Sequence, residues 1–430
     1  MNQNLKNIVK RTILSDVIKH LENPEMTIII GSRQTGKTTL LFQLKGFLLK
    51  KGYSEDEIFI FNLDLLTDLE LFTDQQKFID FLKERIGRRK LFVFVDEAQR
   101  VKNAGVFFKG IYDLNLPVKF ILTGSSTLEI KAKIYESLTG RKRIFHLHPF
   151  SFQEYLSFKA RVLAKIIPKE EISSYSQKEV LKYLFNFITW GGYPKAALQT
   201  NIKEKQQILK EIYSSYIERD VISFLKITQP LSFTKLFNIL AGQIGQLVNF
   251  HELSNTVGIT YRTLEKYLSI LENTFIIKLI PPFFKNQRKE LTKMPKIYFL
   301  DTGLRNFAVD SFKDFDTRLD KGALLENFIF SEIIKNVDLA VHFWRTKDKA
   351  EVDFVLCSRS GKIWPIEVKA TSLRNSKISR GLQNFIKQYH PKNALIINLG
   401  FQGKAKFEGT EVSFIQPHEI VRILSQLKLF

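Results

Sequence analysis

The sequence predicts an α/β protein that opens with a doubly wound parallel sheet of the P-loop NTPase type. Two observations lead there: an apolar strand runs into a glycine-rich loop and a helix at residues 26–44, and strand and helix signals alternate through the first 150 residues. A third, the return of strand signals after a long helical stretch, predicts a second α/β domain. With about 150 residues per domain as a guide, 430 residues, 44% of them apolar, hold several cores. We predict domains at 1–150, 151–227, 228–296 and 297–430.

The first strand and loop, MTIIIGSRQTGKTTLLFQL, predict a phosphate-binding P-loop. Glycines let the backbone fold round a phosphate, and the loop N–H groups with the helix N-terminus supply positive potential. Lys37 is expected to reach the β- and γ-phosphates, where it acts in catalysis, and Thr38 is expected to hold Mg²⁺.

The remaining strands of this sheet are expected near 58–63, 91–96 and 118–123. Strand LFVFVD ends in Asp96 followed by Glu97, a pair suited to holding Mg²⁺ and to activating the attacking water, respectively. Strand KFILTGSS places Thr123, Ser125 and Ser126 near the phosphates. These hydroxyls either orient that water or only cap a turn.

Basic residues follow in LTGRKRIFHLHPFSFQEY. Arg141, with Arg143, is a candidate arginine finger acting in cis or from a neighbouring subunit, and the alternative is a solvated basic loop. His146 and His148 alternate on a predicted strand. A structural role is favoured over metal binding because no other ligands have suitable spacing.

Residues 151–227 are helical and aromatic, are broken by Gly191-Gly192-Tyr193-Pro194, and are predicted to form a helical lid. Residues 228–296 follow the order helix, turn, helix and β wing, with Pro281-Pro282 and the basic KNQRKE at the wing tip. This order predicts a winged helix.

The second helix of that segment, GITYRTLEKYLSILE, has a predicted buried stripe of Tyr261, Leu264, Leu268 and Leu271. The opposite face presents Arg262, Thr263 and Lys266, the candidate DNA contacts. The alternative is a winged helix that serves as an ATPase lid or a protein contact.

Acidic residues recur in two β-rich runs near the C-terminus, KAEVDFVL and KIWPIEVKA, joined by a predicted hairpin turn. If the hairpin is centred on Ser360, Asp353 lies opposite Glu367, close enough to share one divalent cation. Lys369 projects from the same face as Glu367, and Glu326 on an upstream helix could add a third carboxylate. Glu367 and Lys369 are therefore candidate catalytic residues for metal-assisted phosphodiester hydrolysis with Mg²⁺ or Mn²⁺. The alternative is a set of cross-strand ion pairs.

Together with WGGYPKAAL, YIERDV, KIYFLDTGLRNF, KGALLENFIFSEI and FWRTKDKAEVDFVL, these motifs resemble a prokaryotic family of AAA-type, STAND-like ATPases with a C-terminal PD-(D/E)XK-nuclease-like domain. The resemblance implies a restriction-endonuclease-like fold for residues 297–430, with Glu326, Asp353, Glu367 and Lys369 as its active set. For ATP it implies binding by Asp96, by Gly192 and Pro194 of the lid, and by the P-loop. The P-loop residues are Gly31, Ser32, Arg33, Gln34, Thr35, Gly36, Lys37, Thr38 and Thr39; Ser125 is added from its strand-end position.

A formal net charge of +21 predicts a polyanionic partner, with DNA favoured over an anionic membrane surface because no amphipathic basic helix is present. The single cysteine, Cys357, and the lack of a signal-peptide pattern predict a cytoplasmic protein. Two functions follow. One is an ATPase that couples nucleotide state to DNA binding or metal-dependent cleavage, and it would be a homo-oligomer if the arginine finger acts from a neighbouring subunit. The other is a STAND-like switch whose C-terminal domain binds a partner or nucleic acid without cleaving it.

Overall fold

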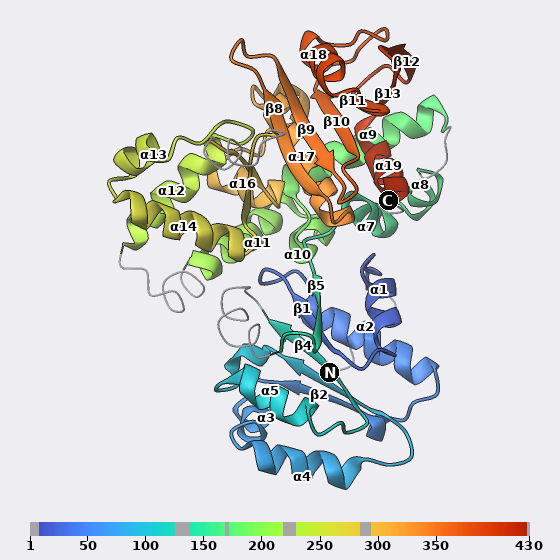
Figure 1. Ribbon diagram of the computed structural model, residues 1–430, viewed down its shortest axis with the longest axis vertical. Coiled ribbons are helices and arrows are strands. Elements are labelled where there is room, and N and C mark those ends of the chain that lie inside the picture. The colour runs from blue at the N-terminus through green and yellow to red at the C-terminus, as the bar shows by residue number, and fades with distance from the viewer. Residues whose placement is uncertain (1–7, 125–137, 168–171, 218–228, 284–293, 428–430) are drawn as a thin grey trace. The chain divides into compact units, whose positions relative to one another are not determined.

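The computed structural model describes residues 8–124, 138–167, 172–217, 229–283 and 294–427 (Figure 1). The chain divides into two compact units. Unit 1 comprises Met1–Pro149 with Asn273–Phe275, and unit 2 comprises Phe150–Glu272 with Ile276–Phe430. Within the described ranges, no helix is both long and apolar enough to cross a membrane.

Unit 1 is built on a five-stranded sheet in the order β2-β3-β4-β1-β5, and all of its strand pairs are parallel. The predicted α/β class with a parallel central sheet is confirmed. Its strands are β1 (Met26–Ile30), β2 (Ile58–Asn62), β3 (Leu91–Asp96), β4 (Val118–Gly124) and β5 (Lys142–His146). Its helices are α1 (Leu14–His20), α2 (Lys37–Lys50), α3 (Leu66–Leu71), α4 (Gln75–Arg85) and α5 (Ala104–Tyr112), with short 3-10 turns η2 (Glu55–Glu57) and η3 (Ala98–Arg100).

Helices cover both faces of this sheet, which explains the continuous apolar runs of β1 and β3. Ile121 of β4 packs in a core with residues of α1 and α2. The neighbouring Phe120, which points to the opposite face, contacts the rings of Phe78 of α4 and Phe108 of α5. Because the strands are parallel, the carboxyl ends of β1, β3 and β4 meet at one edge, where the candidate nucleotide residues lie.

Unit 2 begins with helices and a two-stranded antiparallel sheet of β6 (Ile277–Ile280) and β7 (Lys296–Phe299). Its helices up to β6 are α7 (Phe152–Lys159), α8 (Arg161–Ile166), α9 (Ser174–Trp190), α10 (Pro194–Leu198), α11 (Ile202–Ser215), α12 (Pro230–Gly242), α13 (Phe250–Val257) and α14 (Tyr261–Asn273). The order α12, α13, α14, β6, β7 is the one expected of a winged helix, whose identity stays a prediction. The proposed wing tip, 285–290, lies outside the described residues.

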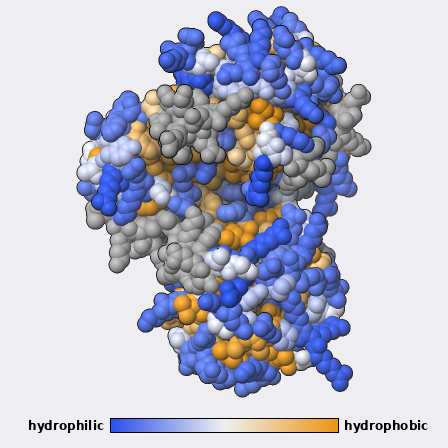
Figure 2. All heavy atoms as spheres, in the orientation of Figure 1, coloured by the Kyte–Doolittle hydropathy of each residue, from blue (hydrophilic) through white to orange (hydrophobic). Residues whose placement is uncertain are grey.

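The rest of unit 2 surrounds a mixed six-stranded sheet in the order β12-β13-β11-β10-β9-β8. Hydrophilic residues predominate on the visible face around α18 and β12 (Figure 2). The strands are β8 (Ala340–Arg345), β9 (Glu351–Cys357), β10 (Ile363–Lys369), β11 (Asn393–Asn398), β12 (Gly403–Phe407) and β13 (Thr410–Ile415). The helical elements are α16 (Thr302–Ala308), η6 (Phe315–Thr317), α17 (Lys321–Asn336), α18 (Arg380–Tyr389), η7 (Pro417–Glu419) and α19 (Ile420–Leu427).

Buried contacts tie the early helices of unit 2 to its C-terminal half. The buried Glu332 of α17 accepts the N–H of Phe152 at the start of α7, with both carboxylate oxygens at 3.2 Å. Gly303 of α16 crosses the end of α9 so closely that a Cβ there would lie 2.1 Å from the Trp190 carbonyl oxygen. Only glycine fits such an approach.

Candidate functional site

The P-loop joins β1 to α2, as predicted. Gly31 passes the Leu147 backbone so closely that a Cβ would meet its carbonyl oxygen at 2.1 Å, so a glycine is required there. Lys37 is buried in the first turn of α2, and its Nζ donates to the carbonyl oxygens of Gly31 (3.0 Å) and Ser32 (3.1 Å). The loop thus wraps around its own lysine. Thr35 is buried, Arg33, Gly36 and Thr39 are half-buried, and Gln34 is exposed with a left-handed φ of 60°.

Three oxygen-bearing side chains meet at the carboxyl ends of β3 and β4 and the start of α2. The hydroxyl of Thr38 donates to Asp96 Oδ2 (2.5 Å), and the hydroxyl of Thr123 donates to Asp96 Oδ1. Asp96 is 4% exposed. Carboxylate and hydroxyl oxygens are the hard ligands that Mg²⁺ prefers, so the residues present fit the predicted ion.

Glu97 follows directly in an unusual backbone conformation, with a φ of 58° that is rare for a residue other than glycine. Its N–H donates to Thr123 Oγ1 (3.1 Å), and its Oε2 accepts a hydrogen bond from Gln99 Nε2 (2.5 Å). Backbone strain of this kind concentrates at functional sites. These contacts mean that Thr123 holds both members of the acidic pair. The other two hydroxyls expected near the phosphates, those of Ser125 and Ser126, lie outside the described residues.

Arg11 supports the P-loop and was missed in the sequence. Its buried guanidinium donates to the carbonyl oxygens of Thr35 (2.8 Å) and His148 (2.6 Å). These partners are 24 and 137 residues away in the chain, and no local pattern links them. Arg11 thereby connects the loop to the segment that leaves β5.

Arg141, the candidate arginine finger, lies away from the P-loop of its own chain. This residue directly precedes β5, which runs parallel to β1 with Met26 opposite Lys142. It therefore lies at the amino edge of the sheet, and the five residues of β1, about 16 Å at 3.3 Å per residue, separate it from the P-loop edge. Its Nε is paired with Asp113 Oδ1 at 2.8 Å. A role for Arg141 in a neighbouring subunit stays a prediction.

Gly192 and Pro194, the residues assigned to nucleotide contact from the lid, lie in unit 2, Gly192 between α9 and α10 and Pro194 at the start of α10. The N–H of Gly192 donates to the buried carboxylate of Asp301 (2.6 Å), and its carbonyl oxygen accepts from the N–H of Phe150 (2.7 Å). Burial raises the pKa of Asp301, while this N–H and other backbone donors oppose the rise. A contact of either residue with nucleotide stays a prediction.

The C-terminal carboxylates gather on one end of the β9–β10 hairpin. The strands pair Cys357 with Ile363 and Phe354 with Ile366, so the hairpin is centred on Ser360 as predicted. The N–H of Val368 donates to Asp353 Oδ2 at 2.7 Å.

Glu367, two residues after Ile366, has two partners of its own. The ammonium of Lys369 lies 2.6 Å from Glu367 Oε1, which confirms that these two side chains share a face. The hydroxyl of Ser379 donates to Glu367 Oε2 at 2.5 Å.

Glu326 of α17 approaches the same region, together with a lysine that the sequence did not single out. Lys296 Nζ lies 3.1 Å from Glu326 Oε1 and contacts Glu351 Oε1, and its side chain is 3% exposed. Tyr298 donates its hydroxyl to Glu326 Oε1 at 2.5 Å. Arg345 NH1 lies 3.4 Å from Glu351 Oε2. We call Lys296, Glu326, Arg345, Glu351, Asp353, Glu367 and Lys369 the acidic cluster.

Burial and mutual charge shift the pKa values in the acidic cluster. Burial raises the pKa of Asp353 to about 8, and the nearby charge of Glu326 adds to the rise while Lys296 opposes it. For Lys296 burial acts against the charged form, but the carboxylates of Glu326, Asp353 and Glu351 outweigh it and raise its pKa. Lys296 is therefore a firmly charged ammonium among carboxylates.

A divalent cation does not fit the acidic cluster as it stands. In the described part of the chain, no three or more His, Cys, Asp or Glu side chains are arranged to hold a metal ion. The carboxylates of Glu326 and Glu351 instead face Lys296. Metal ligation by Glu326, Asp353 and Glu367 stays a prediction that these contacts do not favour.

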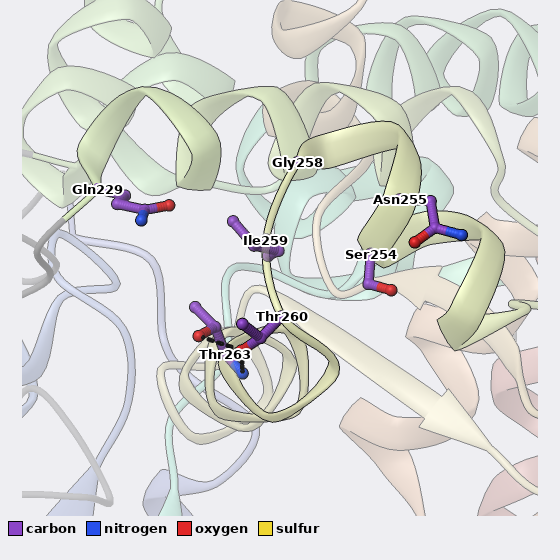
Figure 3. A pocket seen from close by; sticks show the side chains of 7 residues that line it. All are labelled: Gln229, Ser254, Asn255, Gly258, Ile259, Thr260 and Thr263. Atoms are coloured by element: carbon purple, nitrogen blue, oxygen red, sulfur yellow. Dashed lines mark hydrogen bonds between the residues drawn. The ribbon is translucent and has the colours of Figure 1, made fainter.

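The candidate DNA contacts lie on α14. Arg262 and Lys266 are exposed, while Thr263 is half-buried and its hydroxyl is hydrogen-bonded to that of Thr260 at 2.8 Å (Figure 3). The predicted buried stripe is partly wrong. Tyr261 is 39% exposed, and Tyr267 is buried instead.

A shallow pocket of about 440 Å³ opens beside the turn before α14. It is lined by Gln229, Ser254, Asn255, Gly258, Ile259, Thr260 and Thr263 (Figure 3). Its lining carries hydroxyl and amide groups and no charged side chain.

The P-loop around Lys37, the Thr38–Asp96–Thr123 arrangement and the parallel sheet define an AAA-type P-loop ATPase domain. Residues 23–156 match the family model described as an AAA domain, which confirms this part of the prediction. Residues 181–315 and 321–415 match models described as Domain of unknown function (DUF8612) and Domain of unknown function (DUF4143). Neither description names a winged helix or a nuclease.

Similar proteins occur in archaea and bacteria. The chain is 28% identical over 351 residues to an uncharacterized protein of Methanocaldococcus jannaschii, covering 79% of this chain and 73% of that one. It is 24% identical over 425 residues to an uncharacterized protein of Haemophilus influenzae, covering 95% and 97%. Among solved structures, a Walker-type ATPase of Pyrococcus abyssi is similar with a TM-score of 0.45 and 16% identity, covering 71% of this chain and 97% of that one.

Proposed function

We propose that the chain binds and hydrolyses ATP at the carboxyl edge of the unit 1 sheet. The observation that carries this proposal is the meeting of Thr38, Asp96 and Thr123 beside the P-loop. When bound by Thr38 and Asp96, Mg²⁺ would neutralise charge that develops on the phosphates. Lys37 binds the β- and γ-phosphates, and Glu97 accepts a proton from the attacking water.

The proposal extends to unit 2, where the nucleotide state of unit 1 controls DNA binding. A net charge of +21 supports a polyanionic partner, and Arg262 and Lys266 project from α14 into solvent. Contacts from such side chains to phosphates give affinity that depends strongly on salt and weakly on sequence.

Of the two functions that the sequence left open for the C-terminal domain, the acidic cluster favours binding without cleavage. Cleavage by a PD-(D/E)XK-type site needs a divalent cation on Asp353 and Glu367. The contacts of Lys296 with Glu326 and Glu351 satisfy the neighbouring carboxylates without one. DNA binding without phosphodiester hydrolysis is therefore our proposal.

Fluorescence anisotropy with labelled duplex and single-stranded DNA tests the coupling. Binding should differ between a non-hydrolysable ATP analogue and ADP, and Lys37→Ala should remove that difference. Replacing both Arg262 and Lys266 by alanine should reduce the slope of log K against log salt by up to about 1.8, since each phosphate contact contributes about 0.9. The matched control is the double alanine variant of the exposed Lys178 and Lys182 on α9, which should keep the slope.

Two outcomes would contradict the proposal. Equal slopes for the two double variants would remove α14 from the DNA contact. Cleavage of the same DNA with Mg²⁺ or Mn²⁺, lost in Glu367→Ala, would establish the nuclease function instead.

The proposed role of Arg141 in a neighbouring subunit has its own test. Lys37→Ala protein retains Arg141, and Arg141→Ala protein retains an intact P-loop. If the arginine acts between subunits, mixing these two inactive variants should restore part of the ATPase activity. No recovery, in a mixture shown to form mixed oligomers, would exclude that role.

A further inference from the structure

We propose that Lys296 is a built-in cation of unit 2, which takes the place of a divalent metal ion among the carboxylates of the acidic cluster. Removing its charge should convert the cluster into a site for a divalent cation. The inference stands apart from the proposed DNA binding, because metal binding is measured in the absence of DNA and nucleotide.

The position of the ammonium supports this inference. Lys296 reaches inward from β7, and its Nζ contacts carboxylates from two other elements, Glu326 of α17 at 3.1 Å and Glu351 of β9. The group lies 5.6 Å from the centre of the Phe343 ring and is almost inaccessible to solvent. A buried cation that bridges carboxylates from separate elements holds those elements together, as a bound metal ion does in other proteins.

The positive and negative side chains of the acidic cluster balance one another closely. Three of its members are basic and four are acidic, and one of the acidic four, Asp353, has a raised pKa that favours its neutral form. The basic ones are Lys296, Arg345 and Lys369, and the acidic ones are Glu326, Glu351, Asp353 and Glu367. A divalent cation placed next to Lys296 would be repelled by the ammonium group. Because Lys296 is buried, that repulsion is only weakly screened.

Three of the four carboxyl groups also accept a hydrogen bond from a neutral donor, and the fourth, Glu351, is paired with Lys296 and Arg345. Glu326 accepts the Tyr298 hydroxyl, Asp353 accepts the N–H of Val368, and Glu367 accepts the Ser379 hydroxyl. A divalent cation needs ligand oxygens at about 2.0–2.6 Å on several sides. Binding one here would require these bonds and the Lys296 contacts to be exchanged together.

The test is calorimetric titration of the full chain with Mn²⁺ alone, comparing wild type with Lys296→Met. Methionine keeps the apolar stem and removes the charge. The matched control is Lys335→Met. Lys335 is another lysine of unit 2, its side chain is 4% exposed, and it is paired with Glu332 at 3.5 Å outside the acidic cluster. Lys296→Met should bind one Mn²⁺ more than wild type does. Wild type, Lys335→Met and the charge-conserving Lys296→Arg should not bind that ion.

A measurement on wild type keeps the inference testable if Lys296→Met does not fold. Asp353→Asn preserves an acceptor for the N–H of Val368 and removes a carboxylate. If Lys296 occupies the place of the metal, wild type and Asp353→Asn give the same Mn²⁺ titration. A site present in wild type and lost in Asp353→Asn would overturn the inference, as would a folded Lys296→Met that binds no additional ion.

Discussion

Replacing Thr123 by valine should disable ATP hydrolysis while leaving the sheet intact. Thr123 is fully buried on β4, and valine has nearly the same shape and the same β-branching. The change removes a hydroxyl that donates to Asp96 and accepts from the N–H of Glu97. Both residues of the acidic pair would lose the group that positions them.

The contacts of Thr123 set the size of the expected effect. A hydrogen bond to a charged group such as Asp96 contributes about 1.5–3 kcal/mol, and a neutral one such as that from the Glu97 N–H contributes about 0.5–1.5 kcal/mol. Part of the loss appears as lower stability. The part lost from the transition state, about 1.4–2.7 kcal/mol, lowers kcat by about 10–100-fold.

Steady-state phosphate release at saturating ATP and Mg²⁺ measures this effect. The control is Thr123→Ser, which keeps the hydroxyl and should retain kcat within about threefold. A folded Thr123→Val with unchanged kcat would refute our assignment of Thr123 as the group that positions the acidic pair. Equal losses of kcat in Thr123→Val and Thr123→Ser would show that the packing of the side chain, and not its hydroxyl, sets the rate.

Three further predictions concern other parts of the chain. Arg11→Ala should weaken ATP binding about tenfold in calorimetry, because the P-loop loses a charged hydrogen bond, whereas Lys10→Ala on the surface should not. Gly303→Ala should destabilise unit 2 by about 3 kcal/mol in urea unfolding because its Cβ meets a backbone carbonyl, whereas Gly322→Ala, in open space on α17, should leave stability unchanged or raise it by up to about 1 kcal/mol. Burial raises the pKa of Asp353 from 3.8 to about 8, so its contribution to stability is complete below pH 3.8 and is lost as pH rises through about 8. The stability difference between wild type and Asp353→Asn should therefore fall over that range by at most about 1.4 kcal/mol per pH unit, and a constant difference would contradict the raised pKa of this carboxyl.

Local sequence was enough to predict the nucleotide site. The P-loop and the acidic end of β3 depend on strand, turn and helix signals within about ten residues, and parallel strands bring their carboxyl ends together. The β9–β10 hairpin was predictable for the same reason, since its centre on Ser360 follows from two short strands and one turn.

Long-range contacts were not predictable. Lys296 enters the acidic cluster from an element 30 residues before Glu326, and nothing in its own neighbourhood marks it as a partner. The distance of Arg141 from the P-loop depends on strand direction in the assembled sheet, so the local sequence left its role open. Tyr261 has the spacing of a buried residue but lies at the first position of α14, where the side chain turns to solvent.

The contact between Glu332 and Phe152 bears on how the chain folds during synthesis. Nearly all of unit 1 precedes residue 150 and can fold as soon as it leaves the ribosome. The start of α7 cannot form this contact until Glu332 has been translated, 180 residues later. At 5–20 residues per second that is a delay of about 10–40 s. During that interval the apolar faces of α7 and α9 lack their final partners. We expect chaperones to bind newly made chains during this interval.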